Sequence, residues 1–415
     1  MDAPRADPKT SQAFAGEQSA PAEPSGVPRV LVLPPLEQAS LVDPQDRELA
    51  RSLVADATLS LCRSRLYEII APFTAFQLAD GLAAYDMIPA DYVVLTTLVP
   101  SRQPLRHPVL SVEVVATASG KQLYQSEVEL HADTLLGVHS SFCRMLVDRI
   151  CGQIAAEETA RFRRTGSASA YVHYLMAMKR NERSDLTSLQ RAQKSLERSL
   201  RLSPDFVPAL SQLARTKTLE WLERGSTDRA LLHEARHLAQ RAIAYEPKDS
   251  ASLREIGHAT LYLRDLDLAL SNYEAAQDLA PNHADLLADQ ADVLTHLSRH
   301  DEAELKIERA FSLNPLAPDD YYWIGGAVSF FRGDYAQALE RLTTMRSPGL
   351  ALRLMAASAA MLGDHDKARS YRQAALERDP TFTVGKWASL YPEPDKTDTA
   401  HYLNALRLAG FPAAP

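Results

Sequence analysis

Few features of this chain of 415 residues point to a secreted or membrane-inserted protein. Its three cysteines, Cys62, Cys143 and Cys151, are an odd number without CxxC spacing, which argues against a disulfide framework or a structural zinc site. The first residues hold no apolar segment of the kind that a signal peptide needs. The longest weakly polar run, residues 351–362, is too short to cross a bilayer and contains Arg353. We therefore expect a cytoplasmic protein with no membrane partner.

Positive charge is also in short supply. The chain has 45 Lys and Arg against 53 Asp and Glu, which gives a formal net charge of −8 at pH 7. Such a balance gives no general attraction to phosphate backbones, so we expect no direct nucleic-acid partner. A hydrophobic content of 46% is that of a chain that folds, and the length allows two or three domains.

Catalytic and cofactor-binding motifs are nearly all missing. The sequence has no GxxxxGK[ST], GxGxxG, GxSxG or DxDxDG pattern, so we expect no cofactor. One pattern, His233-Glu-Ala-Arg-His237, matches the HExxH of zinc hydrolases, in which the Glu acts as general base. Gln240 and Ile243 stand where further metzincin residues would be, and Glu255 on the next hairpin is the substitute third ligand. We favour two exposed helix histidines over the alternative of a zinc hydrolase, and expect no bound metal and no enzyme.

The N-terminal third predicts a tail and an α/β domain. Residues 1–27 are rich in Ala, Pro and Ser and nearly devoid of large aliphatic side chains, which indicates a disordered tail or linker. Within 28–165 the patterns predict strands at 30–33, 67–70 and 92–95, a hairpin over 109–130 turned at Ser119-Gly120, and helices over 46–63 and 135–164. Another helix between the second and third strands is left open. This order predicts a mixed sheet covered by helices.

A repeat dominates the remainder of the chain. Pro247, Pro281 and Pro315 each follow a helical segment and are 34 residues apart. Small residues recur in step with them at Ala192, Ala235, Ala269, Ala303, Ala338 and Ala368, and again at Ala214, Gly257, Ala291, Gly326 and Ala356. Antiparallel helices approach closely only where one presents Ala or Gly, and Pro suits the point where one helix has ended.

This period is typical of tetratricopeptide (TPR) helical hairpins. We therefore predict an all-α, right-handed TPR superhelix of about six hairpins over 168–390. A capping helix and tail follow over 391–415.

Four segments carry a resemblance to a known bacterial module. They are Arg29–Pro35, Ala90–Val94, Val112–Tyr124 and the ending Leu406–Pro412. In these segments the chain resembles a TolB-type N-terminal domain followed by TPRs, found behind class III adenylate cyclase domains and behind winged-helix transcriptional regulators. The resemblance spans about 28–413 and implies a sensing or docking half. We expect this chain to have neither a cyclase domain nor a winged helix of its own.

The concave surface of the repeat is the predicted functional site. First helices of stacked hairpins line this surface. The phase of the repeat places there Arg215, Arg254, His258, Tyr262, Asp285, Asp292, His296, Trp323, Phe330 and Phe331. Aromatic, basic and acidic groups side by side suit a helix or extended peptide. We thus expect a non-catalytic adaptor or regulatory subunit in bacterial signalling or transcriptional control, which binds a protein or peptide. A scaffold of envelope assembly or secretion is the alternative, and the oligomeric state is left open.

Overall fold

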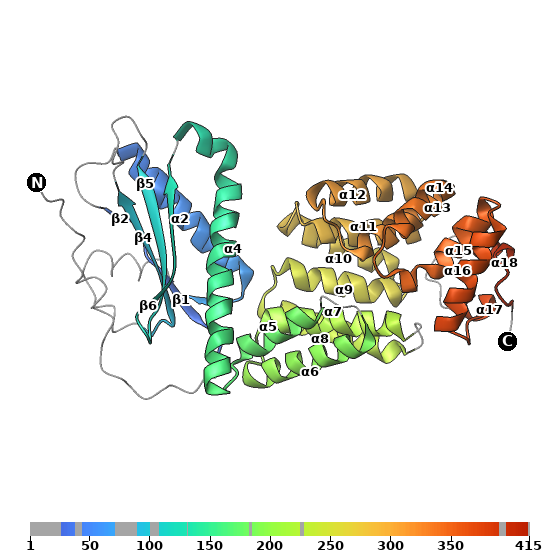
Figure 1. Cartoon of the computed structure of the whole chain (residues 1–415), viewed down its shortest axis with the longest axis horizontal. Helices are drawn as coiled ribbons and strands as arrows, with labels where there is room; N and C mark the ends of the chain where they lie inside the picture. The colour runs from blue at the N-terminus through green and yellow to red at the C-terminus, as the bar shows by residue number, and fades with distance from the viewer. Residues whose placement is uncertain are drawn as a thin grey trace, which may run out of the picture. The chain divides into compact units, whose positions relative to one another are not determined.

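The chain forms two compact units. The computed structural model describes residues 26–37, 44–70, 89–99, 108–130, 132–181, 185–224, 228–389 and 396–413. One unit runs to Lys179 and includes Glu197–Phe206, and the other comprises Arg180–Leu196 and the residues from Val207 onward. A sheet with two helices builds most of the first unit, and helical pairs build the second (Figure 1). No helix in the described part of the chain combines the length and the apolar character needed to cross a bilayer.

The sheet of the first unit is mixed, as predicted. Its strands are β1 (Arg29–Val32), β2 (Leu36–Glu37), β3 (Glu68–Ile69), β4 (Tyr92–Val99), β5 (Val109–Ala116) and β6 (Lys121–Glu129). They lie in the order β3-β1-β4-β5-β6, with β2 also paired to β4. β1 pairs in parallel with β3 and β4, whereas β4, β5 and β6 run antiparallel. The predicted hairpin is confirmed, and Gly120 takes a φ of +61° in its turn, where a residue without Cβ is least strained.

Two helices cover this sheet, and both were predicted. They are α2 (Pro44–Ser64) and α4 (Ala132–Thr165). Leu53 and Leu61 on the apolar face of α2 are fully buried. Tyr92 of the central strand donates a hydrogen bond of 2.6 Å to the buried Glu158 of α4. The further helix left open after the second strand would fall on residues 71–88, which lie outside the described residues.

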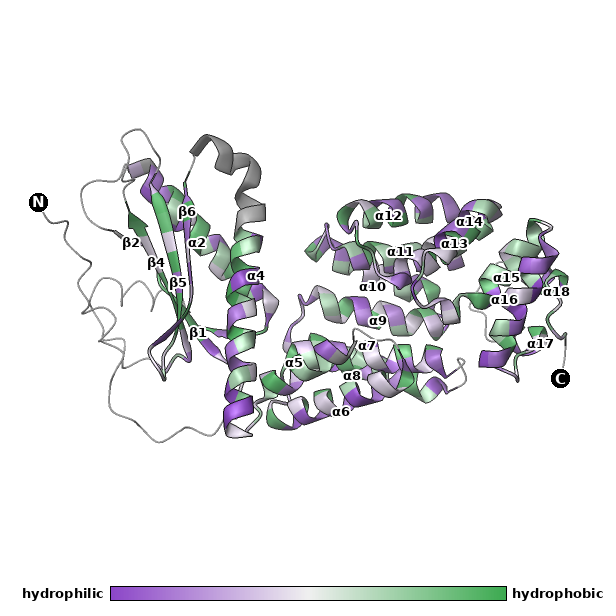
Figure 2. Cartoon of the chain, viewed as in Figure 1, coloured by the Kyte–Doolittle hydropathy of each residue, from purple (hydrophilic) through white to green (hydrophobic). Residues whose placement is uncertain are grey.

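Paired helices make up the repeat. They are α5 (Ala170–Asn181) and α6 (Leu186–Leu202), α7 (Val207–Glu223) and α8 (Arg229–Tyr245), α9 (Ser250–Tyr262) and α10 (Leu266–Leu279), α11 (Ala284–His296) and α12 (His300–Leu313), α13 (Asp319–Phe331) and α14 (Tyr335–Thr343), and α15 (Leu352–Met361) and α16 (His365–Arg378). From α7 to α16 each helix contacts the next one along the chain. Figure 2 shows hydrophobic and hydrophilic residues mixed along these helices, as partly buried helices require. The expected all-α hairpin repeat is confirmed, while its handedness stays a prediction.

The small residues lie where the helices touch. Ala235, Ala269 and Ala303 are fully buried. A Cβ added to Gly257 would lie 3.0 Å from the ring of Tyr273, and one added to Gly326 would lie 2.5 Å from Leu342 Cδ2. The second helix of each of these hairpins therefore occupies the space that a larger residue would need, as the repeat predicts.

The last helices contact residues far back in the repeat. After α16 come α17 (Val384–Ala388) and α18 (Lys396–Leu408), which packs against α15. Asp398 of α18 accepts hydrogen bonds from Ser298 Oγ at 2.5 Å and His300 Nε2 at 2.8 Å. Arg264 donates a bond of 2.6 Å to the carbonyl of Ser389. These contacts join parts of the second unit about 100 residues apart in the chain.

Candidate functional site

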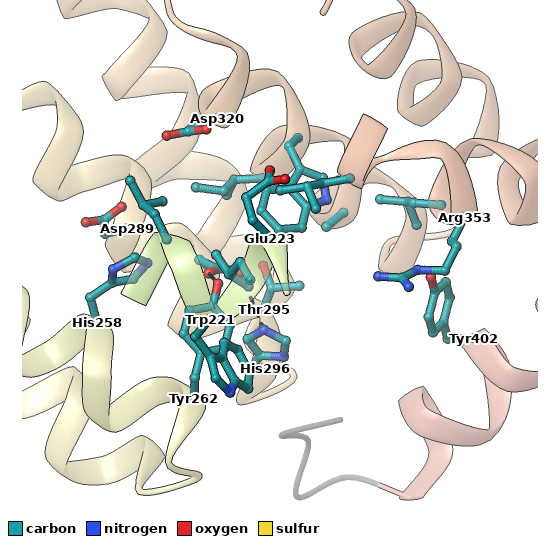
Figure 3. Close-up of a pocket in the computed structure, with 18 of the residues that line it drawn as sticks. Trp221, Glu223, His258, Tyr262, Asp289, Thr295, His296, Asp320, Arg353 and Tyr402 are labelled. Carbon is teal, nitrogen blue, oxygen red and sulfur yellow. Dashed lines mark hydrogen bonds and ion pairs between the residues drawn. The ribbon is translucent and has the colours of Figure 1, made fainter. Parts of the chain in front are cut away.

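A pocket opens on the first helices of four successive hairpins. Residues of α7, α9, α11 and α13 form most of its wall, and α15, α17 and α18 complete it (Figure 3). The cavity volume is about 140 Å³. This space admits one large side chain or several waters, but no whole helix.

Most of the predicted groove residues meet at this pocket. Those that line it are Arg215, His258, Tyr262, Asp292, His296, Trp323 and Phe331. Arg254 and Asp285 belong to the adjoining charge network, where the Arg254 guanidinium lies 3.5 Å from the Asp285 carboxylate. Seven of the ten predicted residues thus lie on one pocket of the first helices. That these residues bind a partner stays a prediction.

Phe330 was placed wrongly on this surface. Its side chain has 0% exposure and packs against the rings of Tyr335, His401 and Tyr402, with centroids 5.4, 5.2 and 5.7 Å away. Neighbouring residues on a helix point about 100° apart, so Phe330 and Phe331 cannot face the same side. The aromatic pair gave no sign of which ring faces inward, because the contacting residues of α18 lie about 70 positions later in the chain.

Two arginines and one aspartate form the buried centre of the charge network. Arg215 Nη1 lies 3.3 Å from Asp289 Oδ2 and 3.1 Å from His258 Nδ1. Arg254 Nε donates to the same Asp289 oxygen at 2.6 Å. Burial opposes ionisation of Asp289, but Arg254 and Arg215 outweigh it and hold the pKa of this carboxyl well below its usual value. Asp289 was missed by sequence reasoning, although its spacing from Asp285 and Asp292 already placed it on their helix face.

The neighbouring carboxyl groups, Asp292 in the pocket and Glu255 in the buried charge network, are not fully compensated by nearby positive charge. Asp292 accepts a hydrogen bond of 3.3 Å from Tyr262 and lies 3.6 Å from His296 Nε2. Burial, and then the charge of Asp289, raise the pKa of Asp292 to about 7. Burial also raises the pKa of Glu255 to about 7, against the opposing charges of Arg215 and Arg254.

The two pocket histidines supply no positive charge at neutral pH. Burial lowers the pKa of His296 to about 4. For His258, burial and then the Arg215 charge move the pKa well below the ordinary value. Both imidazoles are therefore neutral at pH 7.

Aromatic rings form the rest of the wall. The centroids of Trp221 and Tyr262 are 5.0 Å apart, and the buried indole Nε1 of Trp221 has no hydrogen-bond partner among the described residues. On the other side of the pocket Arg353 lies 4.4 Å over the ring of Trp387 and beside Tyr402 (Figure 3). Sequence reasoning missed these residues. Trp221 near the end of α7 was not singled out by the phase of the repeat, and Arg353, Trp387 and Tyr402 join the pocket through long-range packing.

The HExxH residues lie on a different surface. His233 and His237 are exposed on α8, and Glu234 pairs with Lys217 Nζ at 3.2 Å. Glu255, the substitute third ligand, lies in the buried charge network instead. Within the described ranges no three His, Cys, Asp or Glu side chains converge as metal ligands would.

Comparisons with known proteins give similarities only at the level of structure. No family model and no curated protein matches the chain. A tetratricopeptide repeat protein of Thermus thermophilus is 19% identical, with 57% of this chain and 99% of that chain covered and a TM-score of 0.36. PilF of Pseudomonas aeruginosa is 16% identical, with coverages of 51% and 93% and a TM-score of 0.36. A tetratricopeptide repeat protein of Parabacteroides merdae is 16% identical, with coverages of 58% and 93% and a TM-score of 0.34. At such identities and scores, these similarities carry no inference about function.

Proposed function

We propose that this protein is a non-catalytic adaptor that binds a segment of a protein partner in the pocket-bearing groove of α7, α9, α11 and α13. The observation that carries the proposal is the convergence of aromatic and ionisable side chains from four successive hairpins on one open cavity. Aromatic and arginine side chains in such concave sites are the groups that dominate protein recognition.

The cost of this arrangement supports a binding role. Arg215, Glu255 and Asp289 are buried where apolar side chains would suffice to stack helices. Burying ionised groups costs free energy unless they are well paired, and the raised pKa of Glu255 shows that pairing there is incomplete. Ionisable groups whose pKa values are shifted by burial and by neighbouring charges are typical of functional sites. A partner that complements these groups recovers part of that cost.

The resemblance stated for Arg29–Pro35 and Leu406–Pro412 supports a role in bacterial signalling or transcriptional control. In the module that these segments resemble, a TolB-type domain and TPRs accompany a separate output domain. We infer that this chain acts as a regulatory subunit in a system of this kind.

Partner capture with Trp323→Ala tests the proposal. An aromatic anchor in such a groove loses about 2 kcal/mol on truncation, so we expect capture of the partner to weaken by more than about tenfold. The measurement is quantitative pull-down of the partner by full-length tagged protein, followed by mass spectrometry. Unchanged capture by a folded Trp323→Ala protein contradicts the proposal.

Tyr245→Ala is the matched control. Tyr245 is 53% exposed at the end of α8 and does not line the pocket, so its truncation should leave capture unchanged. Glu304 is unsuitable as a control because it pairs with Arg341 at 2.8 Å. Its removal would leave a buried guanidinium with one partner fewer.

A further inference from the structure

One end of the pocket, together with the charge network that adjoins it, carries more acid than its cations can balance. Asp289, Asp292, Asp320 and Arg215 line the pocket, and Glu255, Asp285 and Arg254 lie in the adjoining network. Five acids therefore share two fixed positive charges, since both nearby histidines are neutral at pH 7.

The excess negative charge falls on Asp292 and Asp320, which line the cavity together with Asp289. Both arginines lie within 3.3 Å of Asp289, which takes most of their charge. Asp292 is left with neutral partners, the Tyr262 hydroxyl and the His296 imidazole. Asp320 is 53% exposed on its side chain and lies 3.9 Å from Arg215. Asp292 and Asp320 thus face the cavity without a full counter-charge.

An independent observation in the same pocket points to a ligand. Trp221 lines the pocket and is only 4% exposed, yet its indole N–H has no acceptor within the described structure. A buried donor of this kind is normally satisfied, and leaving it without an acceptor costs free energy. The nitrogen itself is shielded, so a carbonyl group of a ligand would accept this bond once the indole turns toward the cavity.

The walls between these polar groups suit an amphipathic chain. Tyr262, Trp323 and Phe331 present aromatic surface to the cavity. Lysine and arginine side chains bury their methylene stems on such surface and are attracted by ring faces. A cavity of about 140 Å³ accommodates one side chain of this length.

Arg353 makes the two ends of the pocket differ in charge. Figure 3 shows its guanidinium on the side opposite Asp289 and Asp320. There it lies over the ring of Trp387 at 4.4 Å, and no described carboxylate is within ion-pair distance of it. A cationic group of a ligand is therefore repelled from this side and attracted to the acidic end.

We propose that the acidic end of the pocket receives a lysine or arginine side chain of the partner segment, while a main-chain carbonyl of the same segment accepts the hydrogen bond of Trp221. This inference rests on the proposed function, because it names the chemistry of the segment bound in the same groove. Asp292 and Asp320 select the charge, and the aromatic wall holds the stem.

Positional-scanning peptide arrays test the charge selection. In these arrays one position is fixed as Lys, Gln or Glu and all other positions are randomised. Fluorescently labelled full-length protein should bind the Lys arrays at least about tenfold more strongly than the Gln arrays, and the Glu arrays least. An Asp292→Asn, Asp320→Asn double variant should lose this preference and remain folded by circular dichroism. An exposed control, Asp366→Asn on α16, should keep it.

Trp221→Phe separates the carbonyl contact from the charge contact. This substitution keeps an aromatic ring and removes the N–H, so it should weaken binding of the Lys and Gln arrays by the same factor. Competition by free butylamine at millimolar concentration checks that a whole segment is needed. Full displacement of the Lys peptides by butylamine would show a site for small amines and overturn the proposal.

The experiments distinguish a failure of the proposed cation site from a failure of the proposed groove function. Equal binding of Lys and Gln arrays by the unmodified protein, binding of neither, or a preference that survives the double variant would each overturn the cation site. If Trp323→Ala still abolishes partner capture in those cases, the groove function stands. If Trp323→Ala captures normally, the groove function fails whatever the arrays show.

Discussion

Asp289 and Asp292 lie one turn apart on α11, yet the pKa values of their carboxyl groups are shifted in opposite directions. Asp289 is held between Arg215 and Arg254, and its pKa is lowered. Asp292 faces the Tyr262 hydroxyl and a neutral His296, and its pKa rises to about 7. The positions of two guanidinium groups on neighbouring helices decide which acid is ionised.

Asp292→Asn should therefore change how stability depends on pH. The pKa of Asp292 rises from 3.8 to about 7 on folding, so between these values the folded state keeps a proton that the unfolded state loses. Its contribution to stability falls as pH rises through this window, by at most about 1.4 kcal/mol per pH unit. Asn has no such titration. The free energy of unfolding of the variant, relative to the unmodified protein, should increase from pH 5 to pH 7.5.

Urea denaturation followed by tryptophan fluorescence at several pH values provides the measurement. Glu255, His258 and His296 titrate in both proteins, so their contributions largely cancel in the difference. The surface variant Asp366→Asn should show no such trend. A difference between Asp292→Asn and the unmodified protein that stays constant from pH 5 to pH 7.5 would be inconsistent with the raised pKa.

At the scale of elements, stability depends on how closely the helices of each hairpin approach. Gly326→Ala would place a Cβ 2.5 Å from Leu342 Cδ2, so either the buried Leu342 side chain or the two helices α13 and α14 must move. We expect a loss of roughly 1 to 3 kcal/mol in the free energy of unfolding. Thermal melting and urea denaturation of the variant measure it.

Gly152→Ala is the matched control for this overpacking. Gly152 is also helical, on α4, but an added Cβ meets nothing within 4 Å. Ala has the higher helix propensity, so this change should leave stability unchanged or raise it by up to about 1 kcal/mol. If Gly326→Ala and Gly152→Ala change the free energy of unfolding equally, close helix contact does not explain the glycine at position 326.

The sequence predicts those parts of the fold that local spacing determines. The burial of Ala269 and Ala303 and the placement of Tyr262 follow from the period of the repeat. Strand β2 was missed because its two residues directly follow Pro34 and Pro35, which interrupt the apolar run of the first strand. Phe330 was misplaced and Trp221 missed because the residues that they contact, His401 and Tyr402 for the first and Tyr262 for the second, are far away in the chain. Long-range packing therefore determines the part of the site that the sequence could not show.

At the scale of the whole molecule, the two units have separate cores. Leu31 and Val93 belong to the core of the sheet, while Leu354 and Leu406 belong to a core within the repeat. All three tryptophans, Trp221, Trp323 and Trp387, lie in the repeat unit. Tryptophan fluorescence therefore reports on one unit only.

We expect unfolding of the full chain in two steps. Circular dichroism should detect both transitions, since both units contain helix, and tryptophan fluorescence only that of the repeat. The Gly326→Ala substitution should shift the fluorescence transition and leave the other in place. Coincident transitions by both methods, shifted together by Gly326→Ala, would show that the units unfold as one.

Because α17 and α18 form part of the pocket wall, the pocket cannot be complete until the ribosome has synthesised both helices. Arg215 and Asp289 leave the ribosome early, and the hairpins that carry them can pack as soon as they emerge. Trp387 and Tyr402, which complete the pocket wall, follow roughly 100 residues after Asp289, a delay on the order of ten seconds at ordinary rates of elongation. A nascent chain therefore presents an acidic, half-walled surface before it presents a pocket, and the proposed capture of a partner requires that Tyr402 has been added and α18 has docked.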